Sequence, residues 1–373
     1  MKEGWEYKKL GEVCNIYQPK TLSSKELVED GKYLVYGANG VIGKYNSYNH
    51  ESSEVLMTCR GATCGTINVS KPYSWINGNA MVVHPQHNIL SQNFLFYLLK
   101  GLDLSDVITG AAQPQITRQS LAPKKIAIPP LSEQRHIVEE LDLLSSTIEK
   151  KKAQIKELDN LAQSLFYEMF GDPISNEKGW EIGKISNFIN VKGGFAFKSQ
   201  RYTTKGIRLV QIANVWKDSL SWDDITYISE EDAKTNSSFL LKQGDIVMAM
   251  TRPIIQSLEA VKVAIVNEHD IPCILNQRVC KFEIRDSIDN IWLYQFLRLP
   301  YFKYKIKEFS SKGMQPNVSS REIESIQIFV PPFSLQQQFA SKIEAIEHQK
   351  ELIKQSIKEV ETLFNSRMDY YFN

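Results

Sequence analysis

The sequence has no run of apolar residues that could cross a membrane, because nothing in it approaches the roughly 18 consecutive apolar residues that such a helix needs. Residues 1–5 (MKEGW) also lack the apolar stretch of a secretory signal. We therefore expect a cytoplasmic protein that has no membrane partner.

Cysteine and histidine are scarce. The chain has five cysteines and six histidines, and no two cysteines are spaced as Cys-x-x-Cys. His84 and His87 are three residues apart, but Pro85 between them argues against a helical metal-binding pair. An odd number of scattered cysteines indicates reduced, mostly buried thiols, and we expect no metal site in this chain. The cysteines are Cys14, Cys59, Cys64, Cys273 and Cys280.

A strong excess of either charge is also absent. The chain has 44 Lys and Arg residues and 43 Asp and Glu residues, so its net charge is +1. Many nucleic-acid-binding domains are strongly basic, and this balance counts against such a partner. A neutral total can nevertheless include a basic cleft whose charge is offset elsewhere. With 373 residues, the chain is long enough for two or three domains.

What the sequence does contain is an internal repeat. Residues 4–6 (GWE) recur as residues 179–181, at an offset of 175. Residues 113–114 (QP) and 129–130 (PP) recur as residues 315–316 and 331–332, at an offset of 202. The second copy therefore has 27 additional residues in its middle. Both ends are kept while the middles differ, which is expected of one scaffold adapted to two targets.

Each middle segment mixes β-rich runs with turn signals such as Asn39-Gly40 and Asn77-Gly78. Residues 57–60 (MTCR) resemble residues 248–252 (MAMTR). Residues 95–100 and 293–298 carry apolar residues at helical spacing, which predicts amphipathic helices packed on a core. We expect each copy to form an α+β domain of roughly 130 to 150 residues.

A long helix is predicted after each Pro-Pro pair, with Ser132 and Ser334 as N-caps. The apolar residues follow a 4-3 rhythm, and the two seams fall in register at the offset of 202. Lys151 interrupts the first seam and Lys350 the second. The predicted packing residues are Ile137, Leu141, Leu144, Ile148, Ile155, Leu158 and Leu165 in the first helix, and Phe339, Ile343, Ile346, Ile353, Ile357, Val360 and Phe364 in the second.

An apolar stripe of this length must be buried, and packing the two helices against each other achieves this within one chain. We predict an α+β fold with two α/β domains joined by two long antiparallel coiled-coil helices, related by a pseudo-twofold internal repeat. The expected boundaries are residues 1–131, 132–171, 172–333 and 334–373. A generic dimerisation role for the helices remains an equal alternative at this point.

The repeated motifs resemble the specificity subunit of a type I restriction–modification system, and the resemblance covers essentially the whole chain. In the first copy the motifs are Trp5, residues 113–114, residues 128–134 (IPPLSEQ) and the helix at 141–170. In the second copy they are Trp180, residues 315–317 (QPN), residues 330–336 (VPPFSLQ) and the helix at 343–372. The second copy departs from the first at Leu335, which stands where the first has Glu133.

The resemblance implies that each variable domain is a target-recognition domain for one half of a bipartite site in double-stranded DNA. The helices would set the spacing between the halves and dock two modification (methyltransferase) subunits. Those partners would methylate adenine N6 with S-adenosylmethionine. Restriction and translocase subunits, which use ATP and Mg, are further candidate partners.

Catalytic motifs in this chain are incomplete. Residues 330–333 (VPPF) approach the Asn/Asp-Pro-Pro-aromatic motif of adenine methyltransferases, but Val330 has no side-chain acceptor for the amine. Residues 37–44 fail as a P-loop, because five residues separate the glycines and Tyr45 replaces the hydroxyl. Residues 6–8 (EYK) lack the upstream acidic strand of a metal-dependent nuclease. We expect no catalysis and no cofactor in this chain.

DNA contacts are expected from Lys and Arg at phosphates and from Arg, Gln and Asn at base edges. The candidates are Asn39, Lys44, Arg60, Lys71, Asn77, Gln113, Gln115, Arg118, Lys192, Lys198, Arg201, Arg252, Arg278, Lys303, Lys305, Gln315 and Asn317. A structural salt bridge is an equal interpretation for Arg60 and Arg252, and Trp5 and Trp180 are expected to be packing anchors. The alternative functions are a coiled-coil interaction protein without a DNA role and a stand-alone nuclease or methyltransferase.

Overall fold

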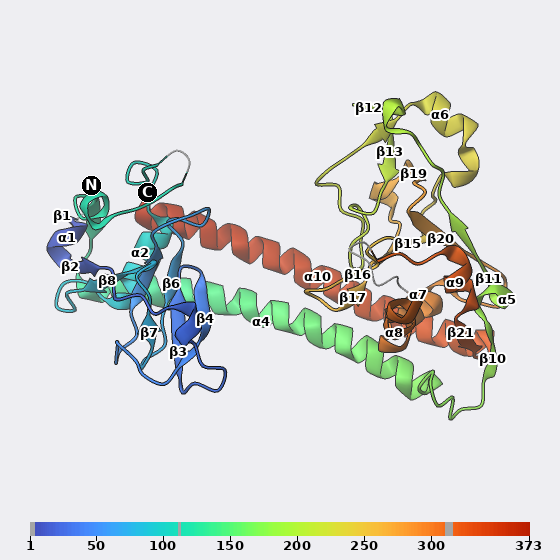
Figure 1. Cartoon of the computed structure of the whole chain (residues 1–373), viewed down its shortest axis with the longest axis horizontal. Coiled ribbons are helices and arrows are strands. Elements are labelled where there is room, and N and C mark those ends of the chain that lie inside the picture. Colours follow the sequence, from blue (N-terminus) through green and yellow to red (C-terminus); the bar gives the residue numbers. More distant parts are fainter. Residues whose placement is uncertain (1–3, 111–112, 310–315) are drawn as a thin grey trace. The chain divides into compact units, whose positions relative to one another are not determined.

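The computed structural model describes residues 4–110, 113–309 and 316–373. It divides into two compact units, of which unit 1 is Met1–Ala153 with Ile353–Asn373 and unit 2 is Gln154–Leu352. The boundary crosses both long helices, α4 (Leu131–Phe170) and α10 (Phe333–Phe372), so each unit contains part of each helix (Figure 1). Among the described residues, no helix is apolar over a length sufficient to span a membrane.

Unit 1 contains a four-stranded sheet in the order β2-β8-β5-β6, a three-stranded sheet β4-β3-β7 and a two-stranded sheet β1-β9. In this unit β3 pairs with β7 in parallel, and the other strand pairs are antiparallel. Its elements before α4 are β1 (Glu6–Lys9), α1 (Leu10–Val13), β2 (Cys14–Tyr17), β3 (Tyr33–Gly37), β4 (Gly40–Tyr45), β5 (Val55–Thr58), β6 (Ile67–Val69), β7 (Trp75–Ile76), β8 (Ala80–Pro85), α2 (Gln92–Gly101), α3 (Arg118–Leu121) and β9 (Lys125–Ile128).

Unit 2 repeats this plan with a four-stranded sheet β11-β20-β15-β18, a second sheet β12-β14-β13-β19 and a two-stranded sheet β10-β21. In the second sheet β14-β13-β19 corresponds to β4-β3-β7, and β12 is an added strand; α6 and the hairpin β16-β17 also have no counterpart among the described elements of unit 1. Its elements are β10 (Glu181–Lys184), α5 (Ile185–Phe188), β11 (Ile189–Gly193), β12 (Tyr202–Thr203), β13 (Ile207–Val210), β14 (Tyr227–Ile228), α6 (Glu230–Thr235), β15 (Ile246–Ala249), β16 (Ile254–Ile255), β17 (Ala260–Val261), β18 (Val263–Ile265), β19 (Cys273–Leu275), β20 (Val279–Ile284), α7 (Asn290–Arg298), α8 (Pro300–Phe309), α9 (Ser320–Ser325) and β21 (Gln327–Val330).

One inner strand of the sheet β2-β8-β5-β6 and one of the sheet β11-β20-β15-β18, namely β5 and β15, are buried on both faces, and we call these two the central strands. Every residue of β5 and of β15 is buried. Alternate side chains of a strand point to opposite faces. Val55 and Met57 accordingly join the core that includes α2, while Leu56 joins the core beside the three-stranded sheet. Ile246 and Val247 divide between two cores of unit 2 in the same way. The sequences of such strands are nearly continuous apolar runs, because neither face of the strand is exposed to water.

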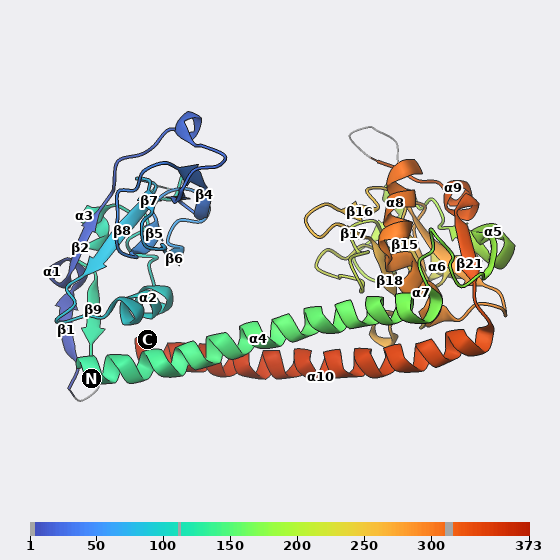
Figure 2. The ribbon, with the colours of Figure 1, turned by 90° about the horizontal axis from the view of Figure 1, so that it is seen from below.

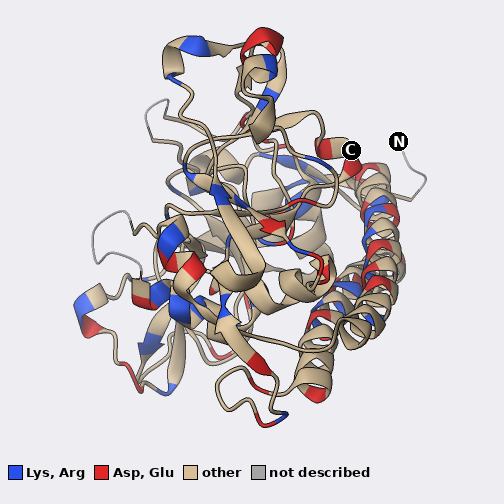
Figure 3. Cartoon of the chain, turned by 90° about the vertical axis from the view of Figure 1, so that its right-hand side faces the viewer, with Lys and Arg blue, Asp and Glu red and all other residues tan. Residues whose placement is uncertain are grey.

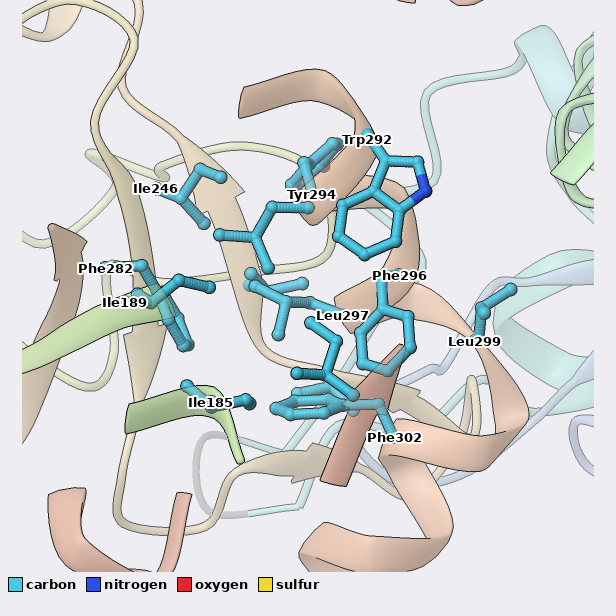
Figure 4. Close-up of a cluster of buried hydrophobic side chains, with 14 of the residues drawn as sticks. Ile185, Ile189, Ile246, Phe282, Trp292, Tyr294, Phe296, Leu297, Leu299 and Phe302 are labelled. Carbon is cyan, nitrogen blue, oxygen red and sulfur yellow. The ribbon is translucent and has the colours of Figure 1, made fainter. Parts of the chain in front are cut away.

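One short apolar helix in each unit lies between the four-stranded sheet and the long helices, α2 in unit 1 and α7 in unit 2 (Figure 2). Ser91 caps α2, and Asp289 caps α7 by accepting from the N–H groups of Ile291 and Trp292. Figure 4 shows Trp292 and Phe296 of α7 pointing into this core. The sequence prediction of two amphipathic helices on a core agrees with this placement.

A buried glutamine ties each short helix to the start of a long helix. Gln134 Oε1 accepts the Ser91 N–H at 2.8 Å, and its Nε2 donates to the carbonyls of Ile89 and Pro129 at 2.8 and 2.9 Å. Gln336 makes the equivalent contacts in unit 2. Its Oε1 accepts the Asp289 N–H at 2.8 Å, and its Nε2 donates to the carbonyls of Ser287 and Pro331 at 3.1 and 2.8 Å. Both side chains are fully buried. The repeated Pro-Pro-x-x-x-Gln motif is therefore a structural brace.

Replacing this brace should destabilise unit 2. Gln336→Ala leaves the Asp289 N–H and two buried carbonyls without their partner, which costs about 2–4 kcal/mol of the free energy of unfolding. Gln337→Ala is the matched control, because Gln337 is the next residue and its side chain is exposed. Thermal and urea unfolding of both variants would measure the difference. Equal stability of the two variants would contradict a bracing role.

The long helices pair antiparallel within each unit. In unit 1, Glu140 of α4 accepts hydrogen bonds from Arg367 Nε and Tyr371 Oη of α10, both at 2.5 Å. In unit 2, Phe166 of α4 packs edge-to-face on Phe339 of α10 at 5.6 Å between ring centroids. All the predicted packing residues are buried or half-buried. Basic and acidic residues are interspersed along both helices (Figure 3). The predicted fold class is confirmed.

The two helices begin one residue before the predicted N-caps. α4 starts at Leu131 and α10 at Phe333, so Ser132 and Ser334 lie inside the first turn. The preceding prolines occupy the cap positions, and the Pro130 carbonyl accepts the N–H groups of residues 133 and 134. The N-cap prediction was wrong by two positions, because a proline can stand before the first turn without losing a helical hydrogen bond.

Lys350 interrupts the seam of α10 but is nevertheless buried, with 4% of its surface exposed. Its Nζ lies 2.7 Å from Asp159 Oδ1 of α4 and 2.9 Å from Glu347 Oε1. Arg298, the last residue of α7, reaches Asp159 at 3.7 Å and Asp218 at 2.9 Å. This polar cluster connects both long helices to the sheet domain of unit 2. A buried charge of this kind is tolerated because carboxylates compensate it.

Stability should fall in acid through Asp159. Burial alone would raise the pKa of Asp159, but the hydrogen bond and charge of Lys350, together with Arg298 and Lys217, hold the pKa below its ordinary value. A lowered pKa contributes stability above the unfolded-state pKa and loses it as pH falls through the folded-state pKa. Between pH 5 and pH 3, wild type should lose more stability than Asp159→Asn does.

Asp286→Asn is the control for this pH series, because Asp286 is exposed and forms no ion pair with any residue that the structure describes. Its stability should follow the wild-type curve when unfolding is measured at each pH. A parallel acid response of Asp159→Asn and wild type would show that the Asp159 pair does not contribute.

Candidate nucleic-acid interface

In unit 1, three loops meet at the end of the central strand β5. The Gly61 N–H donates to the Pro114 carbonyl at 3.0 Å, and the Ile116 N–H donates to the Cys59 carbonyl at 3.0 Å. Arg60 and Gln115 are therefore opposite one another in an isolated β-bridge. The side chain of Arg60 is exposed and that of Gln115 is half-buried. Backbone hydrogen bonds therefore hold the Gln-Pro loop against the strand end.

The β3–β4 turn joins the same group of loops. Thr63 Oγ1 donates to Asn39 Oδ1 at 2.5 Å, and the Thr58 hydroxyl donates to the Ala38 carbonyl. We call Asn39, Arg60, Thr63, Gln113 and Gln115 loop cluster 1. Its amide, hydroxyl and guanidinium groups all carry hydrogen-bonding capacity at the surface. The structure thus brings four of the predicted DNA-contacting residues together and adds Thr63.

Unit 2 builds an equivalent group at the end of β15. The Arg252 N–H donates to the Pro316 carbonyl at 2.7 Å, and the Val318 N–H donates to the Met250 carbonyl at 2.9 Å. The Met250 N–H donates to the Arg278 carbonyl at 2.9 Å. We call Thr251, Arg252, Arg278 and Asn317 loop cluster 2, in which the Thr251 hydroxyl bonds the Asn317 amide oxygen. The guanidinium-bearing residues Arg252 and Arg278 are exposed.

The hydrogen bonds also correct the sequence alignment of the two strand ends. Arg60 bridges Gln115, whereas Thr251 bridges Asn317. Gly61 and Arg252 are the residues that bond the loop proline. Arg252 therefore corresponds to Gly61 and not to Arg60, and the apparent match of two arginines in the sequence was wrong by one position. Repeats of differing length hide such a shift, because the backbone contacts that define the register are not visible in the sequence.

The other candidates lie in varied surroundings. Asn77 is buried, its Oδ1 accepting the Leu22 N–H at 2.7 Å and its Nδ2 donating to the Leu22 carbonyl at 3.3 Å. The exposed candidates are Lys44, Lys71, Arg118 and Lys198. Four cations lie in ion pairs, namely Lys192 with Glu283, Arg201 with Asp232, Lys303 with Glu259 and Lys305 with Glu308. Gln315 lies outside the described residues.

The loop clusters offer hydrogen-bonding and charged groups. Burial raises the pKa of the Cys14, Cys273 and Cys280 thiols to about 12, so these thiols stay protonated at neutral pH. In the described part of the chain, no three His, Cys, Asp or Glu residues cluster in a way that could hold a metal ion. Exposed guanidinium and amide groups on loops are suited to contacting base edges and phosphates.

A duplicated α+β domain with one polar loop cluster per copy, attached to a long helix, defines a class of binding protein with two separate recognition surfaces. Comparison with known proteins assigns the family within this class. The family model described as the type I restriction modification DNA specificity domain matches residues 2–160 and 177–362. The chain belongs to this family, and the resemblance noted in the sequence is confirmed.

Relatives support the assignment over the whole chain. The chain is 25% identical over 385 residues to the MjaVIII specificity subunit of Methanocaldococcus jannaschii, covering 96% of this chain and 90% of that protein. It is 33% identical over 185 residues to the EcoAI specificity subunit of Escherichia coli, covering 47% of this chain and 30% of that protein. The crystal structure of the S subunit from M. genitalium shares the fold, with a TM-score of 0.60, 15% identity and coverage of 99% and 96% of the two chains.

Two asparagines of unit 1 should respond differently to substitution. Asn77→Ala removes the partner of the buried Leu22 backbone and should lower the free energy of unfolding by about 1–3 kcal/mol. Asn39→Ala changes an exposed turn residue and should alter stability by less than about 0.5 kcal/mol. Urea unfolding of the two variants measures this contrast. A destabilised Asn39→Ala alongside an unaffected Asn77→Ala would reverse the two roles.

Proposed function

We propose that this chain is the sequence-specific DNA-recognition subunit of a type I restriction–modification complex. Each unit reads one half of a bipartite site in double-stranded DNA. The observation that carries the proposal is the repetition of one backbone frame with different side chains. Both strand ends are clamped by a Pro carbonyl, but the clamp carries Arg60 and Gln115 in one unit and Arg252 and Asn317 in the other. Family membership supports the DNA as ligand.

The side chains of the two loop clusters match the chemistry of base readout. Arginine, glutamine and asparagine can each form paired hydrogen bonds with base edges in the major groove. The exposed lysines Lys44, Lys71 and Lys198 are suited to phosphates, which add affinity without adding sequence information. Because the two clusters carry different residues, the two half-sites should differ in sequence.

Partner docking is expected on the long helices. Unit 1 exposes Leu143 of α4 and Leu363 of α10, and unit 2 exposes Leu161 of α4 and Leu352 of α10, each with 48–66% of its surface accessible. Exposed apolar side chains mark protein contacts where they group into a patch, and we propose that the two leucines of each unit belong to such a patch. One such pair in each unit fits two modification subunits as partners. The helices that connect the units would also set the spacing between the half-sites.

The chain itself would supply recognition and no catalysis. We propose that the two methyltransferase partners transfer the methyl group from S-adenosylmethionine to adenine N6. Restriction subunits, where present, would supply ATP- and Mg-dependent translocation and cleavage. This division of labour agrees with the buried, protonated thiols and the incomplete catalytic motifs described above.

Reconstitution with the modification subunits tests the proposal. The complete complex and S-adenosylmethionine should methylate a random duplex DNA library at one bipartite sequence, whereas either component alone should not. The double variant Arg60→Ala/Gln115→Ala should reduce methylation about tenfold or more, because it removes two base-reading side chains. Lys125→Ala is the matched control, since this exposed lysine lies on the two-stranded sheet β1-β9.

Three outcomes would overturn the proposal. A complex that assembles but never binds DNA would favour an interaction protein without a DNA role. Methylation or cleavage by the isolated chain would favour a stand-alone enzyme. If the modification subunits methylated the same sites in the presence and in the absence of this chain, they would choose the sequence themselves.

A further inference from the structure

One backbone position distinguishes the two loop clusters. Gly61 and Arg252 each stand three residues after the central strand, and each donates its N–H to the carbonyl of the loop proline. Both have a positive φ, which is 90° at Gly61 and 48° at Arg252. The same left-handed turn is therefore built twice, once with no side chain and once with the longest basic side chain.

The turn is unfavourable for arginine. Glycine adopts a positive φ without steric cost, whereas a residue with a Cβ atom is strained there. Pro253 adds to the restriction, because the residue before a proline is pushed toward extended conformations. An arginine kept against both preferences, at a position where the other copy has glycine, indicates that its side chain has a use outside the fold.

Contacts with the described residues do not explain the side chain. Arg252 is exposed, and its guanidinium forms no hydrogen bond or ion pair with any residue that the structure describes. Lys262 is nearby and half-buried, and it has no ion pair within the described ranges either. Burial and the charge of Arg252 lower the pKa of Lys262. Two neighbouring cations that pair with no carboxylate of the described ranges are expected to favour the approach of a polyanion.

A base contact fits this difference between the copies better than a phosphate contact does. Phosphates are present at every DNA site, so a phosphate-binding residue at a shared position would be useful in both units. Sequence readout must differ between two unlike half-sites. Arginine forms paired hydrogen bonds with O6 and N7 of guanine in the major groove, and this is the commonest specific contact between proteins and DNA.

We propose that Arg252 reads a guanine in the half-site of unit 2, and that Gly61 leaves unit 1 without a reader at the equivalent position. This inference rests on the proposed function, because it assumes that each unit recognises one half-site. It makes Arg252 a specificity-determining residue. It also predicts that the positive φ of Arg252 destabilises the free protein slightly, because the side chain is needed for DNA recognition.

The test uses the full chain assembled with its two modification subunits. Methylated adenines are mapped on a random duplex library, which gives the base preference at each position of both half-sites. Arg60→Ala identifies the half-site read by unit 1. Arg252→Gly, which copies the residue of unit 1, should lose the preference for one guanine in the other half-site about tenfold or more. The preferences in the unit 1 half-site should stay unchanged.

Stability and a conservative variant separate recognition from a structural role. The thermal midpoint of Arg252→Gly should be unchanged or higher, because glycine relieves the strained turn. Arg252→Lys keeps the charge but not the paired donors, so it should also lose the guanine preference.

Any one of three results overturns the inference: Arg252→Gly keeps the guanine preference, Arg252→Gly melts at a lower temperature, or Arg252→Lys retains full discrimination. Absence of site-specific methylation by the wild-type complex would instead refute the proposed function, so the two failures are distinguishable.

Discussion

A buried glutamine at the start of each long helix is the contact on which the rest of each unit depends. Gln134 and Gln336 each satisfy three backbone groups, which belong to the cap of the short helix, the loop before it and the Pro-Pro pair. The short helix shares its core with the central strand and with the long helix. Fixing the short helix therefore also fixes the strand end from which the polar loops project.

In both units the clamp between the loop proline and the strand end is made by backbone atoms, and this separates folding from recognition. The clamp uses N–H and carbonyl groups at Gly61, Pro114, Arg252 and Pro316, none of which depends on side-chain identity. Side chains at the surface of the clamp are then free to differ between the units. Arg252 is the exception, because its positive φ is strained for any residue with a Cβ atom. At this position the backbone conformation favours glycine, whereas the proposed readout needs arginine.

Much of the fold could be predicted from the sequence because its signals are periodic or repeated. The helical seams, the short apolar helices and the two-copy plan all follow from spacing alone. The sites were harder to predict. Asn77 resembles any other Asn-Gly turn residue, yet its amide is used inside the fold. The correspondence of Arg252 with Gly61, and the contribution of Thr63 and Lys262, depend on contacts between segments that are separated in the chain and have no local signature.

The charged pair in the core of unit 2 has a consequence for how such proteins can exchange parts. Asp159 and Lys350 are 191 residues apart in sequence, but Lys350 Nζ lies 2.7 Å from Asp159 Oδ1. A crossover between relatives at any point between them would inherit the two partners from different parents. Unless both parents kept a matching carboxylate and amine, the hybrid would lose this ion pair between the two long helices, and removing one partner of a buried pair is destabilising. The chemistry of this one pair therefore limits which second domains can be inherited with which helices.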